Sequence, residues 1–300
     1  MPDGLFLLDK APGASSNQAL QAAKKLLHAK KAGHLGSLDP MATGLLPISL
    51  GEGTKFSQFL LEADKEYFVV LRLGVCTSTG DTEGEVIETR PVAVQEKDIG
   101  PVLARLTGEQ EQVPPMHSAV KYKGKALYHW ARMGQEVPRQ PRKITIYALE
   151  YLGLEKDLLK LRVASSKGTY IRVLALDIGK ALGCGAHVAE LRRSKCGPFR
   201  VEDAMTLEAL ALLPPEARLD RILPVETMAS HLPEIILAQE LLYHLRQGQE
   251  VWQPKVRERG MVRLRSEDLG FLGIGEVLAD GRIAPRRLVR LGASRKQAIK

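Results

Sequence analysis

The sequence predicts a mixed α+β fold, with a largely antiparallel sheet flanked by helices and a small C-terminal β-rich unit. Strand and helix patterns alternate irregularly along the 300 residues, without the strict strand–helix–strand rhythm of a doubly wound sheet. Two strand patterns, residues 143–155 and 158–166, are separated only by a short charged turn. From residue 234 onward compact strand patterns dominate, and Ala279-Asp280-Gly281 has the composition of a hairpin turn.

The first part of the chain contains elements of both kinds. Residues 4–10 predict a strand, residues 18–28 a helix that follows an Asn or Ser cap, and residues 55–63 a second helix. Residues 66–74 are rich in β-branched and aromatic side chains, which is typical of a buried strand. Residues 77–90 have the composition of a loop that leads into another strand.

The later elements continue this irregular order. The helical spacing that begins at Val94 is interrupted by Gly100-Pro101, so we expect a broken helix there. The remaining predictions are helices over residues 125–134 and 168–183, a strand over 186–199 and a helix-rich connector over 201–233.

These patterns divide the chain into a large domain over residues 1–230, a small β-rich domain over 231–293 and a basic tail over 294–300. The N-terminus has no basic leader before its short apolar run. A membrane helix needs roughly 18 consecutive apolar residues, and the chain has no such run. We therefore expect a cytoplasmic protein without a membrane partner.

The charge of the chain favours a polyanionic partner. Lys and Arg outnumber Asp and Glu by 43 to 35, a net charge of +8. Positive residues gather at positions 24–31, 139–143, 192–195 and 286–300. Patches so far apart in sequence can converge on one surface that contacts many phosphates, although each alone is also typical of a solvated face.

The three cysteines favour reduced thiols, because an odd number in a long chain without secretory features does not suit a disulfide framework. Cys184 and His187 have the spacing of two metal ligands, but neither a CxxC pair nor an HExxH motif accompanies them. We therefore interpret both residues as packing residues and expect no metal.

The stretch GHLGSLDPMATGLLPI, residues 33–48, places one aspartate among small and apolar residues. Asp is a favoured helix N-cap and Pro a favoured first helical residue, so Asp39-Pro40 predicts a helix start over the residues that follow. The alternative is that the Asp39 carboxylate reacts. The stretch alone does not decide between these two interpretations.

Arg172 supplies a possible partner for that carboxylate. It lies in the apolar helix pattern GTYIRVLALDIG, where no acidic residue stands three or four positions away. An unpaired buried guanidinium costs about 3–5 kcal/mol, so Arg172 needs a carboxylate from elsewhere in the fold. Pairing with Asp39 would keep that carboxylate ionised and oriented, as a nucleophile requires. Alternatively, Arg172 reaches solvent along its stem.

Three further residues have two interpretations each. Tyr67 and Tyr170 are typical of core tyrosines whose hydroxyls find a partner, or they supply flat rings on which an extruded base stacks. His34 is a surface histidine or a side chain that fills the space left by a flipped base.

Familiar phosphate and calcium motifs are missing from the sequence. GEGTKF, residues 51–56, lacks the spacing of a P-loop, DTEGE at residues 81–85 is too short for a calcium loop, and no GxSxG occurs. Any chemistry therefore has to use a carboxylate, with neither a metal nor an organic cofactor.

Long blocks along nearly the whole chain carry a family resemblance. They are LLDKAPGASSN, AGHLGSLDPMATGLLPISLGEGTKFSQFLL, DKEYFVVLRLG with TSTGDTEGEV, PPMHSAVKYKGKALYHWAR, SKGTYIRVLALDIGKALGCGAHVAELRR and IAPRRLV. Together they resemble the bacterial TruB family of tRNA pseudouridine synthases, which act on the T-loop uridine at position 55 of tRNA. GHxGxLDPxAxGLL is the most specific block, whereas KAPG replaces the more usual KPxG.

The resemblance implies a role for each matching residue. Asp39 matches the catalytic aspartate, Arg172 the arginine that pairs with it, and Tyr67 the tyrosine that stacks on the target base. The remaining matches are His34, which enters the space under the extruded uridine, Tyr170 and Leu191, which line the uridine pocket, and Lys10, a supportive lysine of the first family motif.

The resemblance also implies the reaction and the partners. A uridine of the T arm is flipped out, Asp39 acts as a nucleophile or removes a proton after glycosidic cleavage, and the uracil rejoins the ribose through carbon. The implied architecture is the pseudouridine synthase fold with a C-terminal PUA-type RNA-binding module. The implied partner is tRNA, bound by a monomer without guide RNA or cofactor.

Three other functions fit parts of the sequence. A non-catalytic RNA-binding protein would account for the basic patches. A carboxylate-dependent glycosidase or phosphorylase of nucleosides would need a second acid near Asp39, and the adjacent sequence offers none. A guide-RNA-dependent relative would need partners, and this chain lacks long basic extensions.

Overall fold

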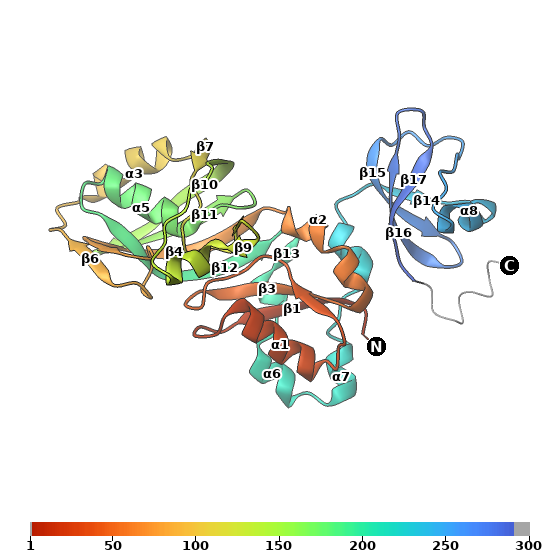
Figure 1. The fold of residues 1–300 in the computed structure, drawn as a ribbon, viewed down its shortest axis with the longest axis horizontal. Coiled ribbons are helices and arrows are strands. Elements are labelled where there is room, and N and C mark those ends of the chain that lie inside the picture. The colour runs from red at the N-terminus through yellow and green to blue at the C-terminus, as the bar shows by residue number, and fades with distance from the viewer. Residues whose placement is uncertain (1, 291–300) are drawn as a thin grey trace.

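The structure is a computed structural model, which describes residues 2–290. The chain forms an elongated molecule with a large unit at one end and a small C-terminal unit at the other (Figure 1). The predicted basic tail over residues 294–300 lies outside the described residues, as does the end of the predicted domain 231–293. Within residues 2–290, no helix has both the length and the apolar character needed to cross a membrane.

A nine-stranded, largely antiparallel sheet forms the large unit, as the sequence predicts, in the order β1-β3-β12-β4-β11-β10-β7, with β2 paired to β3 and β13 to β12. One contact is parallel: β12 meets β3 only at Arg192 with Thr43 and Arg193 with Gly44. The strands are β1 (Gly4–Lys10), β2 (Ala32–His34), β3 (Thr43–Leu50), β4 (Lys65–Leu73), β7 (Gly108–Gln112), β10 (Arg142–Glu155), β11 (Leu158–Ser165), β12 (Ala186–Cys196) and β13 (Phe199–Arg200).

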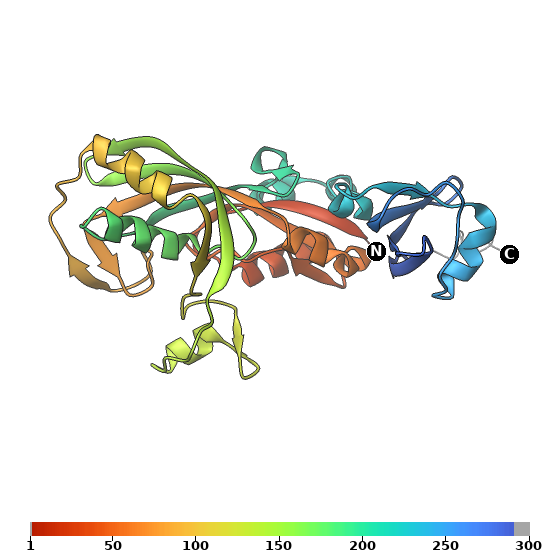
Figure 2. The same ribbon diagram turned by 90° about the horizontal axis from the view of Figure 1, so that it is seen from above.

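Helices flank this sheet, and a small subdomain projects from it. The helices of the large unit are α1 (Ser16–Leu26), α2 (Ser57–Leu61), α3 (Glu96–Arg105), α4 (Leu127–Arg132), α5 (Ile171–Ala181), α6 (Leu207–Leu212) and α7 (Pro215–Leu219). Two short hairpins complete it, β5 (Val75–Thr77) with β6 (Val86–Thr89) and β8 (Lys121–Tyr122) with β9 (Lys125–Ala126). Figure 2 shows the segment of β8, β9 and α4, in yellow-green, standing away from the sheet.

Several predicted helices differ in detail. The predicted cap of α1 is confirmed, because the Ser15 side chain accepts from the Gln18 backbone in a capping box. The predicted break at Gly100-Pro101 is wrong: α3 runs through it. Both residues are exposed, so water can satisfy the carbonyl that Pro101 leaves without a donor. The helix predicted over 125–134 shortens to α4, and that over 55–63 to α2, which follows a 3₁₀ turn.

The predicted helix start at Asp39 is also wrong. Asp39 and Pro40 lie in a turn in which the Ala42 N–H donates to the Asp39 carbonyl, and strand β3 begins immediately afterwards. β3 pairs with β1 along its length and with β2 at its end, and nearly all of its residues are buried. Strand pairing therefore overrides the local preference of Asp-Pro for a helix N-terminus.

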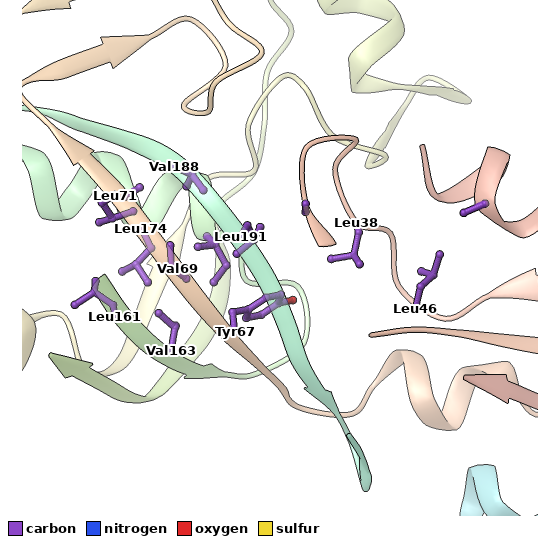
Figure 3. Packing of buried hydrophobic residues seen from close by; sticks show 14 of the residues in the cluster. Leu38, Leu46, Tyr67, Val69, Leu71, Leu161, Val163, Leu174, Val188 and Leu191 are labelled. Atoms are coloured by element: carbon purple, nitrogen blue, oxygen red, sulfur yellow. The ribbon is translucent and has the colours of Figure 1, made fainter. Parts of the chain in front are cut away.

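The main core lies between this sheet and its helices. Alternate residues of β4 are buried, so Tyr67, Val69 and Leu71 point to one side of the sheet. Figure 3 shows Tyr67 at the end of this row, beside Leu191, with its hydroxyl on the side toward Leu38. The buried residues of β4 therefore extend from the core to the side of the sheet where the loop with Asp39 lies.

The C-terminal unit is a four-stranded sheet with one short helix, as predicted. It comprises β14 (Glu234–Ile236), β15 (Gly260–Ser266), β16 (Gly270–Val277), β17 (Ile283–Leu288) and α8 (Leu242–Arg246). The predicted hairpin at residues 279–281 joins β16 to β17. A shared apolar cluster attaches the unit to the large one, with the Phe56 and Phe271 ring centroids 5.7 Å apart.

Substitution of Gly44, at the parallel contact, tests how closely β3 and β12 have to approach each other. Gly44 has φ +97°, and a Cβ there would lie 2.4 Å from the Arg193 carbonyl oxygen. We expect Gly44→Ala to lower the free energy of unfolding by about 3 kcal/mol, from left-handed strain and overlap together. Gly183→Ala is the control, because Gly183 has φ +80° with no neighbour within 4 Å, and should cost about 1 kcal/mol. Equal losses in denaturant unfolding would show that the close approach is unimportant.

Candidate active site

The centre of the candidate site is an ion pair between Arg172 and Asp39. Arg172 is in the first turn of α5 and is only 5% exposed. Its Nε lies 2.9 Å from Asp39 Oδ2, and its Nη2 donates to Asp39 Oδ1 at 3.2 Å. The predicted pairing is confirmed, and the alternative in which Arg172 reaches solvent is wrong. A fork that contacts both oxygens fixes the plane of the carboxylate as well as its position.

Asp81 is a second carboxylate on the same guanidinium. It is 2% exposed, and its Oδ2 lies 3.5 Å from Arg172 Nε. Asp81 Oδ1 accepts from the Thr79 hydroxyl and the Glu83 backbone N–H, so this side chain has a fixed orientation. Arg172 is therefore held between two acids, only one of which reaches the pocket described below.

Backbone carbonyls take the remaining donors of Arg172. Its Nη1 donates to the Thr79 carbonyl at 3.1 Å, and its Nη2 also donates to the His117 carbonyl at 2.7 Å. The guanidinium thereby ties α5 to the loop after β5 and to the base of the projecting segment. Rotation of Arg172 away from Asp39 would break contacts on both sides.

The loop that carries Asp39 is anchored by Lys10 and Ser16. Lys10 is 2% exposed, and its Nζ donates to the carbonyls of Ala42 at 2.7 Å and Pro40 at 3.1 Å. The Ser16 hydroxyl donates to the Leu38 carbonyl at 2.8 Å and accepts from the Leu38 N–H at 2.7 Å. Asp39 is thus held by contacts immediately before and after it in the chain.

The surroundings of the Asp39 carboxyl set the direction of its pKa. Burial raises this pKa above its ordinary value, and the Asp81 carboxylate raises it too. The guanidinium of Arg172 opposes the rise through its charge and its hydrogen bond, and the Lys10 ammonium opposes it as well. The arginine therefore limits a rise in the pKa rather than producing a fall.

A pocket of about 280 Å³ opens beside the ion pair. Of the residues predicted for the site, five line it: Asp39, Tyr67, Tyr170, Arg172 and Leu191. These residues come from the β2–β3 loop, β4, the start of α5 and β12. The Asp39 side chain is 35% exposed, which leaves it open toward the pocket. The walls combine aromatic and apolar surface with one oriented carboxylate, an arrangement suited to a flat polar molecule.

The other two predicted residues do not line the pocket. Lys10 lies beneath the Asp39 turn, where it contacts carbonyl groups. His34 is half-buried in β2, and its Nδ1 has no hydrogen-bond partner. Burial lowers the pKa of His34, and the charge of Arg193 lowers it further. Lys10 supports the loop from behind, and a direct contact of either residue with substrate stays a prediction.

Sequence reasoning missed several residues of this site. Asp81 lies within TSTGDTEGEV, a quoted family block, yet nothing in its spacing points to Arg172. Gln112, at the end of β7, accepts from the Tyr170 N–H at 2.7 Å and donates to the Tyr170 carbonyl at 3.1 Å. Arg193 and His117 also line the pocket. Packing between segments distant in the sequence brings these side chains to the site, so no local sequence pattern indicates their roles.

Metal ligation receives no support in the described part of the chain. Among residues 2–290, no cluster of three or more His, Cys, Asp or Glu side chains could hold a metal ion. Cys184 is buried, and the His187 Nδ1 is 2.9 Å from the Val75 carbonyl oxygen. Both are accounted for by packing and hydrogen bonding.

Comparison with known proteins identifies the family. The model of the TruB family pseudouridylate synthase N-terminal domain matches residues 24–171, and two TruB C-terminal domain models match residues 172–230 and 233–289. A tRNA pseudouridine synthase B from Aromatoleum aromaticum is 52% identical over 296 residues, which cover 99% of this chain and 96% of the relative. The chain belongs to the TruB family. A second member, from Stutzerimonas stutzeri, is 52% identical over 96% of this chain and 95% of its own.

Solved structures agree with the TruB assignment. A chain of "a Cbf5-Nop10-Gar1 Complex" is 31% identical, with a TM-score of 0.72 over 92% of this chain and 79% of that chain. A chain of an "H/ACA RNP bound to a substrate RNA containing 2'-deoxyuridine" is 27% identical, with a TM-score of 0.73 over 96% and 85%. The mixed sheet and the C-terminal β unit are therefore features of a pseudouridylate synthase of the TruB family.

The ammonium of Lys10 predicts a pH dependence of stability. Burial lowers the pKa of Lys10 from 10.5 to about 8, so between these values the unfolded chain binds more protons than the folded one. The unfolding free energy contributed by Lys10 therefore rises with pH across that window, by about 2 kcal/mol between pH 7 and 9.5.

Comparison of the wild type with Lys10→Met isolates this contribution. Denaturant unfolding at the two pH values should show the wild type gaining stability relative to the variant as the pH rises. A difference between the two proteins that does not change with pH would show that Lys10 titrates as it does in water.

Proposed function

We propose that the protein isomerises the uridine at position 55 in the tRNA T loop to pseudouridine, with Asp39 as its nucleophile. The observation that carries this proposal is the position of Asp39, the one acidic residue among those that line the pocket in residues 2–290. Its relatives in Aromatoleum aromaticum and Stutzerimonas stutzeri are named tRNA pseudouridine synthase B.

The pocket supplies what a base-flipping isomerase needs. An extruded base loses its stacking, at a cost of a few kcal/mol, and the Tyr67 and Tyr170 rings offer replacement contacts. Leu191 adds apolar surface on the same wall as Tyr67. The walls of the pocket also limit the escape of a detached uracil from its ribose.

The proposed reaction is balanced within the substrate. The bond between uracil N1 and ribose C1′ breaks, the base turns, and a bond forms between C5 and C1′. The proton that leaves C5 is balanced by one gained at N1, so no oxidant, reductant or second substrate is consumed. In this scheme Asp39 acts as the nucleophile, and Arg172 keeps both of its carboxylate oxygens oriented.

The positively charged surface supports a tRNA partner. Three lysines are exposed in the N-terminal part of the chain: Lys25 at the end of α1, and Lys30 and Lys31 just before β2. A groove of about 420 Å³ where the two units meet is lined by Arg287, Glu62 and two cations that are already paired, Lys55 with Glu52 and Arg286 with Glu276. Part of the predicted basic surface is neutralised, however, because Arg192 pairs with Asp9 and Lys195 with Glu66.

We further propose how the chain is organised and where it acts. Residues 1–230 form the catalytic domain, and residues 231–293 form a PUA-type module that contacts tRNA outside the T loop. The protein acts as a monomer in the cytoplasm, without guide RNA or cofactor. Support comes from the separate apolar cluster of the C-terminal unit and from the basic groove beside it.

A nucleoside glycosidase is less well supported. That reaction would need a second acid facing the sugar, and the two nearby carboxylates are Glu83, which is absent from the pocket lining, and Asp81. Asp81 is 2% exposed, contacts Arg172 and is absent from the pocket lining. Conversion of free uridine, without conversion of tRNA, would favour the glycosidase.

Asp39→Asn tests the proposed function. We expect the wild type to convert one T-loop uridine of an unmodified tRNA transcript with no other component present. The variant should bind the transcript with similar affinity but react at least about 10⁴-fold more slowly, because it lacks the nucleophile. Pseudouridine is measured by mass shift after chemical labelling, and binding by filter retention. Binding without conversion by the wild type would instead favour a non-catalytic RNA-binding protein or a guide-dependent enzyme.

Arg287→Ala tests the basic groove between the units. Loss of one phosphate contact should weaken tRNA binding. It should also reduce the steepness with which the logarithm of the association constant falls against the logarithm of the salt concentration by about 1. Lys97→Ala, on the exposed face of α3 at the far end of the molecule, is the control for a lost charge. If both variants change the slope equally, the groove does not contact tRNA.

A further inference from the structure

Arg193 is a buried cation without a buried anion. It lies on β12, is 1% exposed, and forms no ion pair with any carboxylate among residues 2–290. The neighbouring Lys65 ammonium carries the same charge. A buried charge is costly unless hydrogen bonds replace its water. The hydrogen bonds of Arg193 therefore have to offset the cost of burying its charge.

Backbone carbonyls on both sides of Asp39 replace that water. Arg193 Nη2 donates to the Gly36 carbonyl at 3.0 Å, and Nη1 donates to the Ser37 carbonyl at 3.5 Å. Nε donates to the Leu45 carbonyl at 2.6 Å. Gly36 and Ser37 precede Asp39, whereas Leu45 follows it on β3. One guanidinium thus closes the base of the loop that presents the nucleophile.

The same guanidinium contacts the aromatic wall of the pocket. Arg193 and Tyr67 are paired across β12 and β4. Burial raises the pKa of the Tyr67 hydroxyl, while the charge of Arg193 and its hydrogen bond to that hydroxyl act in the opposite direction. Arg193 itself lines the pocket beside both residues.

We propose that Arg193 is a positioning residue for the isomerisation, which sets the separation between the Asp39 carboxylate and the Tyr67 ring. This inference rests on the proposed function and deepens it. A planar guanidinium suits the task, because its donors diverge in fixed directions toward the loop on one side and the tyrosine on the other. An ammonium concentrates its donors at one point and cannot span the same groups.

Arg218 provides a matched control for a purely structural arginine. Its Nε, Nη1 and Nη2 donate to the carbonyls of Leu213, Leu26 and Ala211. Arg218 lies on α7, away from the pocket. Both arginines donate to backbone carbonyls, but Arg218 is half-buried whereas Arg193 is 1% exposed, and Arg218 holds a segment away from the pocket.

The test compares Arg193→Lys, Arg193→Met and Arg218→Met in single-turnover reactions with tRNA at saturating enzyme, well below the melting temperatures. We expect both Arg193 variants to lower the rate constant by about 10- to 100-fold, because the nucleophile and the base are misaligned. Their Kd for tRNA should stay within about threefold of the wild type, since the phosphate contacts are unchanged. Arg218→Met should lower the melting temperature and leave the rate constant unchanged.

A double-mutant cycle separates positioning from a general loss of structure. Tyr67→Phe removes the hydroxyl that Arg193 contacts, so Arg193→Lys should cost less in that background than in the wild type. Fully additive effects, an unchanged rate constant, or loss of the folded protein in both Arg193 variants would each overturn the proposal. Failure of the wild type to convert tRNA would overturn the proposed function instead, so the two failures are distinguishable.

Discussion

The ion pair between Arg172 and Asp39 is the interaction on which the site depends. It joins side chains 133 residues apart in the chain. This buried guanidinium faces two carboxylates, Asp39 and Asp81, which offset the cost of removing its charge from water. Asp81 is enclosed, whereas Asp39 opens onto the pocket, so the arginine contacts a buried carboxylate on one side and orients an accessible carboxylate on the other. The first turn of α5, the loop after β5 and the base of the projecting segment all meet at this cation.

Two further buried cations fix the loop that carries Asp39. Lys10 holds the carbonyls that follow the aspartate, and Arg193 holds carbonyls before it and on β3. These contacts give the loop a definite shape without regular secondary structure. They also explain why a helix does not form there: the backbone groups that a helix would use are already bonded to side chains and to the neighbouring strands.

Much of the fold could be predicted from the sequence, because β4, β10 and β11 each have a strong pattern of apolar residues. The Arg172–Asp39 pair could also be inferred, since an apolar helix pattern with an unpaired arginine requires a distant acid. Asp81 and Arg193 could not be found in this way. Asp81 stands in a polar loop that has no periodicity, and Arg193 bonds mainly to carbonyls, which every residue possesses. The predicted helix start at Asp39 was wrong because pairing of β3 with β1 and β2 outweighed the local preference of Asp-Pro for a helix N-terminus.

In the proposed mechanism, Arg172 serves the chemistry of Asp39 rather than the binding of RNA. The most direct measurement is the single-turnover rate constant and the tRNA Kd of Arg172→Met, with circular dichroism to confirm its folding. The rate constant should fall by about 100-fold or more, because the carboxylate loses its orientation, while the Kd should stay close to that of the wild type. An unchanged rate constant, or equal losses of rate and affinity in a folded variant, would contradict this mechanism.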